Sequence, residues 1–310
     1  MTVRESAPSE GADVLASASW IPVWAMPNVS ISVPIEASHA ALVPSGDERL
    51  RSIGESKPAL WTFLTAFHDE FGNQIHPTIG MVREDSLQGV KTVTAFGGFR
   101  DAVCLSAIVA GRGVSLLHNS ANGILHSEAF DVYPWFLVPE LTKTIAVLTP
   151  ALIGQHILDE LRPQSAPALG NRHLSQLDQP LLEALVARWE HCFATGKESV
   201  EDRRLFRALE MARAASKMPG GRDASEHDAG RLAALWVSAF EILAHDEKHS
   251  SCNRVLLLLD RVEWLREKLK RRDRQARVRK DMFVPSNLAG QIYGRLNEAR
   301  NDFLHGNPVN

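Results

Sequence analysis

The chain has 310 residues, of which 45% are hydrophobic and 23% are charged, and its formal net charge is −3. This is the composition of an ordinary soluble protein, and the length can bury a large core and suggests two domains. The three cysteines, Cys104, Cys192 and Cys252, are far apart and odd in number, which argues against a disulfide framework and for a reducing cytoplasm. We expect neither a signal peptide nor a membrane span, because the N-terminus lacks an apolar core and prolines and charges interrupt the most apolar stretch, 136–158.

The N-terminal half is expected to be a mixed α/β region. Residues 1–18 are small and polar and are predicted to form a disordered tail. Residues 161–171, rich in Pro, Ser, Ala and Gly, are the best candidate for a linker, so a first domain of unknown role is placed at 19–170. Its predicted elements are, in chain order, one or two strands within 20–35, a helix over 59–71, a strand over 90–96, a helix or a buried strand over 101–110, and a turn at 119–123.

The C-terminal part of the chain has a helical pattern to its end. Apolar residues recur at helical spacing in five segments joined by short loops, which predicts an all-α bundle. The five predicted helices cover 181–193, 200–217, 228–244, 253–277 and 287–304. The fold class predicted for the whole chain is therefore α+β, with a mixed N-terminal region followed by a helical bundle.

The charge is distributed unevenly between the two halves. Residues 1–196 hold 12 basic and 20 acidic side chains, whereas residues 197–310 hold 22 and 17, and the stretch 266–280 alone has nine basic and two acidic side chains. Such a basic excess suggests contact with a polyanion such as RNA, and the alternative is a solvated helix face. The predicted RNA-binding side chains are Arg266, Lys268, Lys270, Arg271, Arg272, Arg274 and Arg277.

An arginine and a histidine, Arg300 and His305, close the last predicted helix. Arginine holds a phosphate with a permanent charge and a planar fork of donors, and histidine can move a proton near neutral pH. Two other arginine–histidine pairs have similar spacing, but 112–118 starts in a Gly-Arg-Gly segment expected to be a turn. In the pair 222–227, Arg222 follows two glycines and precedes Ser225, an expected helix N-cap, so that pair is expected in a loop. Only Arg300 lies inside a long periodic helix.

The pattern of that last helix also predicts its buried face and its ends. Ser286, after a proline, is the expected N-cap, Gly306 is the expected residue just beyond the C-terminal end, and Pro308 blocks continuation. The apolar stripe expected to be buried consists of Leu288, Ile292, Leu296, Ala299 and Phe303.

Three segments of the chain resemble a known family. Residues 298–306 read Glu-Ala-Arg-Asn-Asp-Phe-Leu-His-Gly, residues 235–243 read Leu-Trp-Val-Ser-Ala-Phe-Glu-Ile-Leu, and residues 130–135 read Phe-Asp-Val-Tyr-Pro-Trp. The first two resemble the signature helices of Apea-like HEPN domains, and the third is similar to a segment upstream of such domains. The resemblance covers roughly 175–310, and the first half of the chain resembles no family that we can name.

The resemblance implies a metal-independent endoribonuclease that leaves a 2′,3′-cyclic phosphate and a 5′-hydroxyl. In that interpretation His305 takes or relays the proton of the ribose 2′-hydroxyl, Arg300 stabilises the charge on the phosphate, and Asn301 orients the arginine or contacts a phosphate. Enzymes of this family commonly serve in host defence or toxin–antitoxin systems, which implies a cytoplasmic protein with a regulatory or antitoxin partner.

Arg300 and His305 lie about 140° apart around an ideal helix and do not converge within it. The family's usual solution is a homodimer in which two motifs face one cleft, and the resemblance implies the same here. Three alternatives are a structural role for both residues, a non-catalytic HEPN module that dimerises and binds RNA or a protein partner, and a scaffold whose basic helix binds a nucleic acid.

Glu241 is the single acid in the middle of an otherwise apolar helix face. A buried carboxylate needs a partner, and Arg300 is the natural candidate. The pair is either a structural ion pair or a catalytic group that orients the arginine.

We expect neither a metal nor a cofactor. His245 and His249, four residues apart and near Cys252, allow zinc to be considered, but the predicted helix ends at this point. The glycine pairs 97–98 and 220–221 lack the spacing of a phosphate-binding loop.

Overall fold

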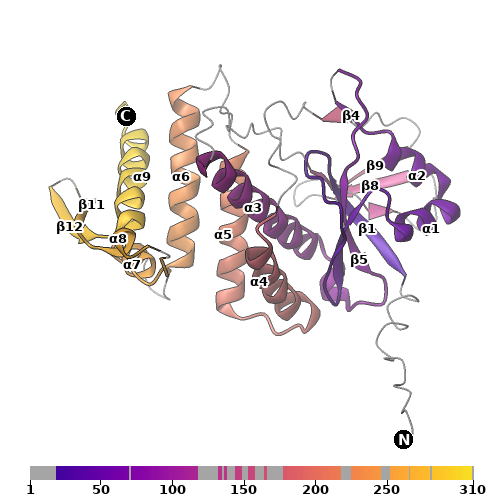
Figure 1. The fold of residues 1–310 in the computed structure, drawn as a ribbon, viewed down its shortest axis with the longest axis horizontal. Helices are drawn as coiled ribbons and strands as arrows, with labels where there is room; N and C mark the ends of the chain where they lie inside the picture. The colour runs from indigo at the N-terminus through magenta and orange to yellow at the C-terminus, as the bar shows by residue number, and fades with distance from the viewer. Residues whose placement is uncertain are drawn as a thin grey trace, which may run out of the picture.

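The computed structural model describes residues 19–69, 71–117, 132–134, 136–137, 144–148, 153–157, 164–165, 177–217, 225–245, 252–264, 266–279 and 281–308. The predicted tail at 1–18, the turn at 119–123 and most of the linker at 161–171 lie outside these residues. Within them the fold is α+β: an antiparallel sheet with its helices comes first, and a largely helical region follows (Figure 1).

A five-stranded antiparallel sheet forms the centre of the N-terminal region. Its strands are, in spatial order, β2 (Ile35–Glu36), β3 (Ala40–Pro44), β5 (Thr78–Arg83), β1 (Trp20–Met26) and β6 (Tyr133–Pro134). The strands predicted within 20–35 are present as β1 and the start of β2. The other described strands of this region form two small sheets, β7 (Phe136–Leu137), β8 (Thr144–Leu148) and β9 (Ile153–Ile157) in one, and β4 (His68–Asp69) with β10 (Gln164–Ser165) in the other.

Helices cover both faces of the five-stranded sheet. On one face lie α1 (Glu48–Ser56) and α2 (Pro58–Thr65), packed on a buried layer that includes Ala41, Val43 and Met81. On the other face lies α3 (Val93–Leu117), packed on a layer that includes Trp24 and Leu42. Because β3 and β5 are buried on both sides, their side chains do not alternate between apolar and polar, and the sequence pattern did not predict them.

The segment around helix α3 differs from the sequence predictions in three respects. The strand predicted over 90–96 is wrong: a 3-10 turn (Gln88–Lys91) leads into α3, and the Thr92 hydroxyl accepts a hydrogen bond from the Ala95 N–H at 3.2 Å at the start of the helix. The expected turn around Arg112 is also helical. Among the described residues, the segment Val93–Gly113 is the one helix long and apolar enough to cross a membrane, and we had not expected such a segment. Here more than half of it is buried in the core.

The predicted all-α bundle is also wrong in one place. The elements of the C-terminal part are α4 (Gln179–Trp189), a π-helical turn η4 (Glu190–Ala194), α5 (Val200–Ser216), α6 (Glu226–Leu243), α7 (Cys252–Leu259), α8 (Glu267–Lys270), β11 (Arg274–Arg279), β12 (Met282–Ser286) and α9 (Leu288–Leu304). Four of the five predicted helices are present, but the one over 253–277 ends at Leu259. Its basic end forms the short helix α8 and then, from Arg274, the first strand of the hairpin β11–β12. Arginine and lysine favour helices locally, but Ala276, with its cross-strand partner Val284, packs into a core cluster beside Tyr293.

One core joins the two halves of the chain. The ring centroids of Trp24 on β1 and Trp189 on α4 each lie 5.3 Å from that of Phe99 on α3, and Trp189 Nε1 donates to the Ala95 carbonyl at 2.7 Å. Helices α4 and α5 therefore pack with the sheet-bearing region, across the linker predicted at 161–171. Figure 1 shows α6 standing between this body and α9, with the hairpin at the far end from the sheet.

Candidate functional site

Helix α9 carries the arginine–histidine motif and is fixed at both ends. Its N-cap is Asn287 rather than the predicted Ser286: the Asn287 side chain accepts from the Gly290 N–H at 2.9 Å and donates to the Leu259 carbonyl at 3.0 Å. At the other end His305 is the C-cap, and Gly306 has the predicted left-handed conformation, with φ +73°.

The buried face of α9 differs from the predicted apolar stripe. Ile292 is 51% exposed, whereas Gly290, Tyr293, Gly294 and Asn297 are buried. Gly294 lets another backbone segment approach closely, because a Cβ atom there would lie 3.0 Å from the backbone nitrogen of β11 residue 277, whereas the atoms closest to Gly290 belong to the side chains of Ser286 and Leu256. The buried face of the helix therefore combines an apolar side chain, Tyr293, with a close backbone approach at Gly294.

Arg300 points from α9 toward α6, where it meets Glu241. Its Nη2 donates to Glu241 Oε1 at 3.1 Å and to Asn297 Oδ1 at 2.6 Å. Both charged side chains are 22% exposed, and the buried Arg300 Nε has no hydrogen-bond partner among the described residues. The partner expected for Glu241 is thus present, and the contact fits a structural pair and an orienting pair equally.

Two further polar groups surround this ion pair. Burial raises the pKa of the Cys252 thiol, and the charge of Glu241 raises it to a smaller extent. The same two causes raise the pKa of the Tyr293 hydroxyl. Both groups are therefore neutral near pH 7.

A groove of about 470 Å³ runs between the C-terminal end of α9 and strand β11. His305 and Asn301 line it from α9, and Arg277 and Arg279 line it from the hairpin. Its other lining residues are Val278, Asn297, Glu298, Asp302 and Asn307. The groove thus presents an imidazole, amides and two guanidinium groups, the types of side chain that bind a phosphodiester, beside two carboxylates, Glu298 and Asp302, the first of which is paired with Arg277.

The structure places Arg300 and His305 on different faces of α9. Arg300 is not among the residues that line the groove, whereas His305 is exposed within it. Asn297, which the sequence analysis did not identify, connects the two faces because it accepts from Arg300 and also lines the groove. The separation is the one expected from a spacing of five residues on a continuous helix.

The seven predicted RNA-binding side chains differ in their contacts and in their position relative to the groove. Arg266, Lys268, Lys270 and Arg271 are exposed on and around α8. Arg272 donates to the Pro285 carbonyl at 2.9 Å, and Arg274 pairs with Asp273 at 2.7 Å. Of the seven only Arg277 lines the groove; it forms an ion pair with Glu298 and lies 6.0 Å from the centroid of the exposed Phe283 ring.

Arg279 was not among the predicted binding residues. The alternation of Arg277, Val278 and Arg279 is a strand pattern that could have identified it. In the part of the chain that the structure describes, no cluster of three potential metal ligands occurs; His249 lies outside that part, and so do Phe130, Asp131 and Trp135 of the segment similar to the HEPN-upstream tract.

Comparisons with models of protein families, with curated proteins and with solved structures found no match to this chain. Any assignment of 175–310 to a family therefore depends on the residues of α6 and α9 and on their arrangement.

Proposed function

We propose that the chain is a metal-independent endoribonuclease of HEPN type, with residues 175–310 as its Apea-like HEPN domain. The observation that carries the proposal is the groove at the end of α9, where His305 and Asn301 face two arginines of the hairpin. Arg300, one residue before Asn301, is held close by through Asn297 and Glu241.

The groove supplies the groups that RNA cleavage by internal transfer needs. His305 removes the proton of the 2′-hydroxyl, the 2′-oxygen attacks phosphorus, and the bond from phosphorus to the 5′-oxygen breaks. The products are a 2′,3′-cyclic phosphate and, after the leaving oxygen takes a proton, a 5′-hydroxyl. Arg277 and Arg279 hold the phosphate backbone, as permanently charged donors do in other phosphate sites.

Arg300 completes this site in a homodimer. Within one chain it faces α6, so the proposal brings the Arg300 of one protomer to the groove of the other. Apolar side chains exposed near α9 offer a surface for such pairing: Leu257 is 61% exposed, Phe283 57%, Ile292 51% and Leu304 62%. A cytoplasmic role in host defence or in a toxin–antitoxin system, with an antitoxin partner, is the corresponding biological proposal.

The second candidate function is a HEPN module that dimerises and binds RNA or a protein without cleaving it. The observation that favours it is the engagement of Arg300 with Glu241 and Asn297 on a face away from His305.

Cleavage of mixed RNA by the purified full chain in EDTA tests the proposal. His305→Ala should reduce the rate by about 10²–10⁴-fold, since positioned proton transfer contributes that much. His76→Ala, at an exposed histidine of the sheet-bearing region, is the matched control and should cleave like wild type. Cleavage that survives His305→Ala, or that EDTA abolishes, contradicts the mechanism, and binding without cleavage in the wild type favours the second candidate.

A further inference from the structure

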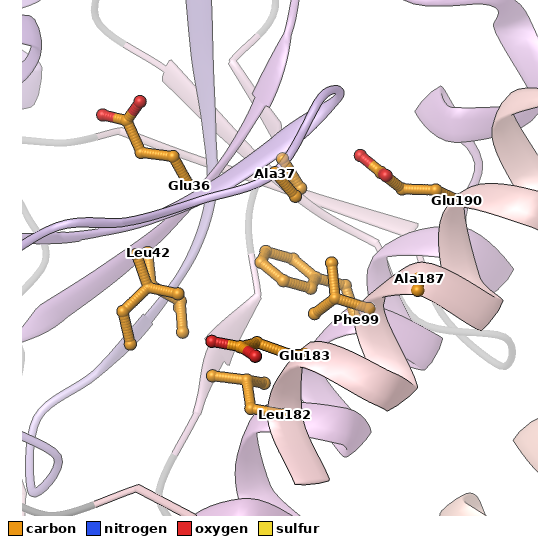
Figure 2. Close-up of a pocket in the computed structure, with 11 residues that line it drawn as sticks. Glu36, Ala37, Leu42, Phe99, Leu182, Glu183, Ala187 and Glu190 are labelled. Atoms are coloured by element: carbon orange, nitrogen blue, oxygen red, sulfur yellow. The ribbon is translucent and has the colours of Figure 1, made fainter. Parts of the chain in front are cut away.

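An apolar cavity of about 150 Å³ lies far from the groove, between the edge of the five-stranded sheet and helix α4 (Figure 2). Strands β2 and β3 form one wall, and α4 with the first residue of the π-helical turn η4 forms the other. The cavity therefore lies where the N-terminal sheet meets the first helix after the predicted linker.

The interior of this cavity is apolar and firmly packed. Leu42, Phe99 and Leu182 line it and are each at most 2% exposed, because their other sides belong to the main core. A closed cavity of roughly 150 Å³ lined by such side chains accommodates a benzene ring, and this cavity has about the same volume but is open on one side. These three side chains form a closed floor, and the room for an aromatic ring or a branched alkyl group lies above it, against Ile35, Val186 and Ala187.

The mouth of the cavity is acidic. Glu36, Glu183 and Glu190 belong to its lining, and no lysine or arginine is among the described residues that line it. Figure 2 shows the Glu183 and Glu190 side chains extending from the helical segment toward the strands. Carboxylates of one sign beside apolar walls concentrate a negative potential at the opening and favour a cation there.

Of these three carboxylates, Glu183 is the most available to a ligand, as the contacts of all three show. Glu36 pairs with Arg49 at 2.8 Å, and Glu190 Oε1 accepts from the His39 N–H at 2.9 Å. Glu183 is exposed, and its hydrogen bond comes from a neutral amide, Gln179 Nε2, at 3.1 Å.

The helix backbone is irregular at the mouth of the cavity. The helix changes from α to π geometry at Glu190, the residue that reaches across the cavity to the strand side. Single π-helical turns inside helices often mark functional positions, because they redirect a side chain at some cost in helix regularity. Here the turn directs Glu190 to the sheet edge.

We propose that this cavity is a binding site for a small organic cation, with its apolar body against Ile35, Val186 and Ala187 and its ammonium group at Glu183. Such a ligand joins the sheet to α4. The inference does not depend on ribonuclease activity, because the cavity and the groove share no residue.

Isothermal titration calorimetry on the full chain tests this proposal with three probes of similar size: 2-phenylethylamine, 2-phenylethanol and phenylacetate. The amine should bind at least about tenfold more tightly than the alcohol, since a charge-assisted contact contributes about that much, and phenylacetate should not bind. Equal affinities for the amine and the alcohol, or no heat from the amine at millimolar concentration, overturn the proposal.

Variants of α4 then place the binding in the cavity. Glu183→Gln should weaken amine binding by about tenfold, and Ala187→Leu, which fills the mouth, should abolish it. The matched controls are Glu55→Gln on α1 and Ala184→Leu on α4, both at exposed residues outside the cavity lining, and both should bind like wild type. Amine binding that persists in Ala187→Leu overturns the proposal, and so does an equal loss in Ala184→Leu.

Discussion

At the scale of single residues, the contact with Glu241 helps to set the direction of the Arg300 side chain. Both side chains retain some exposure to water, and ion pairs of this kind contribute at most about 1 kcal/mol to stability. Asn297 is almost fully buried and holds the same guanidinium nitrogen. Two acceptors on one nitrogen fix the orientation of the arginine more than they stabilise the fold.

Glu241→Gln separates an orienting role from a structural one. The amide keeps the shape and one acceptor but removes the charge. We expect the cleavage rate to fall by about tenfold or more, as for other groups that position a charged catalytic residue, while the unfolding free energy falls by about 1 kcal/mol or less. RNA cleavage and urea unfolding of the same preparations measure both, with Glu210→Gln on α5 as the control. A cleavage rate per folded molecule equal to that of wild type would show a purely structural pair.

The buried thiol of Cys104 should make the free energy of unfolding depend on pH in the alkaline range. Burial, and to a smaller extent the charge of Asp101, raise the pKa of the Cys104 thiol to about 12, whereas a thiol in the unfolded chain ionises near about 8.5. Between these values the unfolded state loses the proton first, so its free energy falls relative to the folded state. The thiol's contribution to stability is therefore complete below about pH 8.5 and is lost as pH rises, by up to about 1.4 kcal/mol per pH unit.

The corresponding measurement compares wild type with Cys104→Ala by urea unfolding at pH 8 and pH 10 under reducing conditions. The variant should be less stable at pH 8 because it leaves a cavity, and the difference in unfolding free energy should shrink by about 2 kcal/mol at pH 10. Val109→Ala, at an exposed position of the same helix, should show a difference independent of pH. A constant difference for Cys104→Ala would rule out the raised pKa.

At the scale of elements, Gly294 decides how α9 packs on the hairpin. Alanine is the better helix former by about 1 kcal/mol, but its Cβ would lie 3.0 Å from one backbone atom of β11 and 3.3 Å from another. A backbone neighbour cannot move aside as a flexible side chain can. Gly294→Ala should therefore lower the unfolding free energy by about 1–3 kcal/mol, as measured by urea unfolding. Ile292→Ala, at an exposed residue of the same helix, should change it by less than about 0.5 kcal/mol, and a stabilised Gly294→Ala would refute this packing argument.

Elements with local signals could be predicted from the sequence, and elements that depend on distant contacts could not. Ser199 and Ser225 each form a capping box with an aspartate three residues later, so α5 and α6 begin close to where the pattern places them. The hairpin was not predicted because its arginines favour a helix locally. The strand depends on the pairing of Ala276 with Val284, which the local pattern does not show. The groove is a consequence of that hairpin, so Arg279 and Asn297 were missed with it.

At the scale of the whole molecule, the elements form a continuous series from the sheet to the hairpin. Trp189 ties α4 to α3 and to the sheet-bearing core, and α6 stands between that core and α9 (Figure 1). Single-sequence patterns cannot show that residues 179–216 pack with the sheet, because that choice depends on the shapes of surfaces far apart in the chain. The motif helix lies near one end of this series, with its groove and several exposed apolar side chains away from the core.

A site shared between two protomers can be restored by mixing two inactive variants, which a site within one chain cannot. In a two-fold symmetric dimer with composite sites, each site takes Arg300 from one protomer and His305 from the other. A heterodimer of Arg300→Ala with His305→Ala then has one site with both defects and one intact site. Mixing the two inactive proteins under conditions that exchange subunits should restore about a quarter of the wild-type rate, since half of the dimers are mixed and each has one of two sites intact.

Cleavage of RNA by the mixture, beside each variant alone, is the measurement, and light scattering at micromolar concentration checks that dimers form. A control mixture of His305→Ala with the double variant Arg300→Ala/His305→Ala should stay inactive, because none of its dimers has an intact pair. If the first mixture is also inactive although light scattering shows dimers and the wild type cleaves, the site lies within one chain. Arg300 would then have to leave Glu241 and turn around α9 to reach the groove of its own chain, and Glu241→Gln, which loosens that contact, should raise the cleavage rate instead of lowering it.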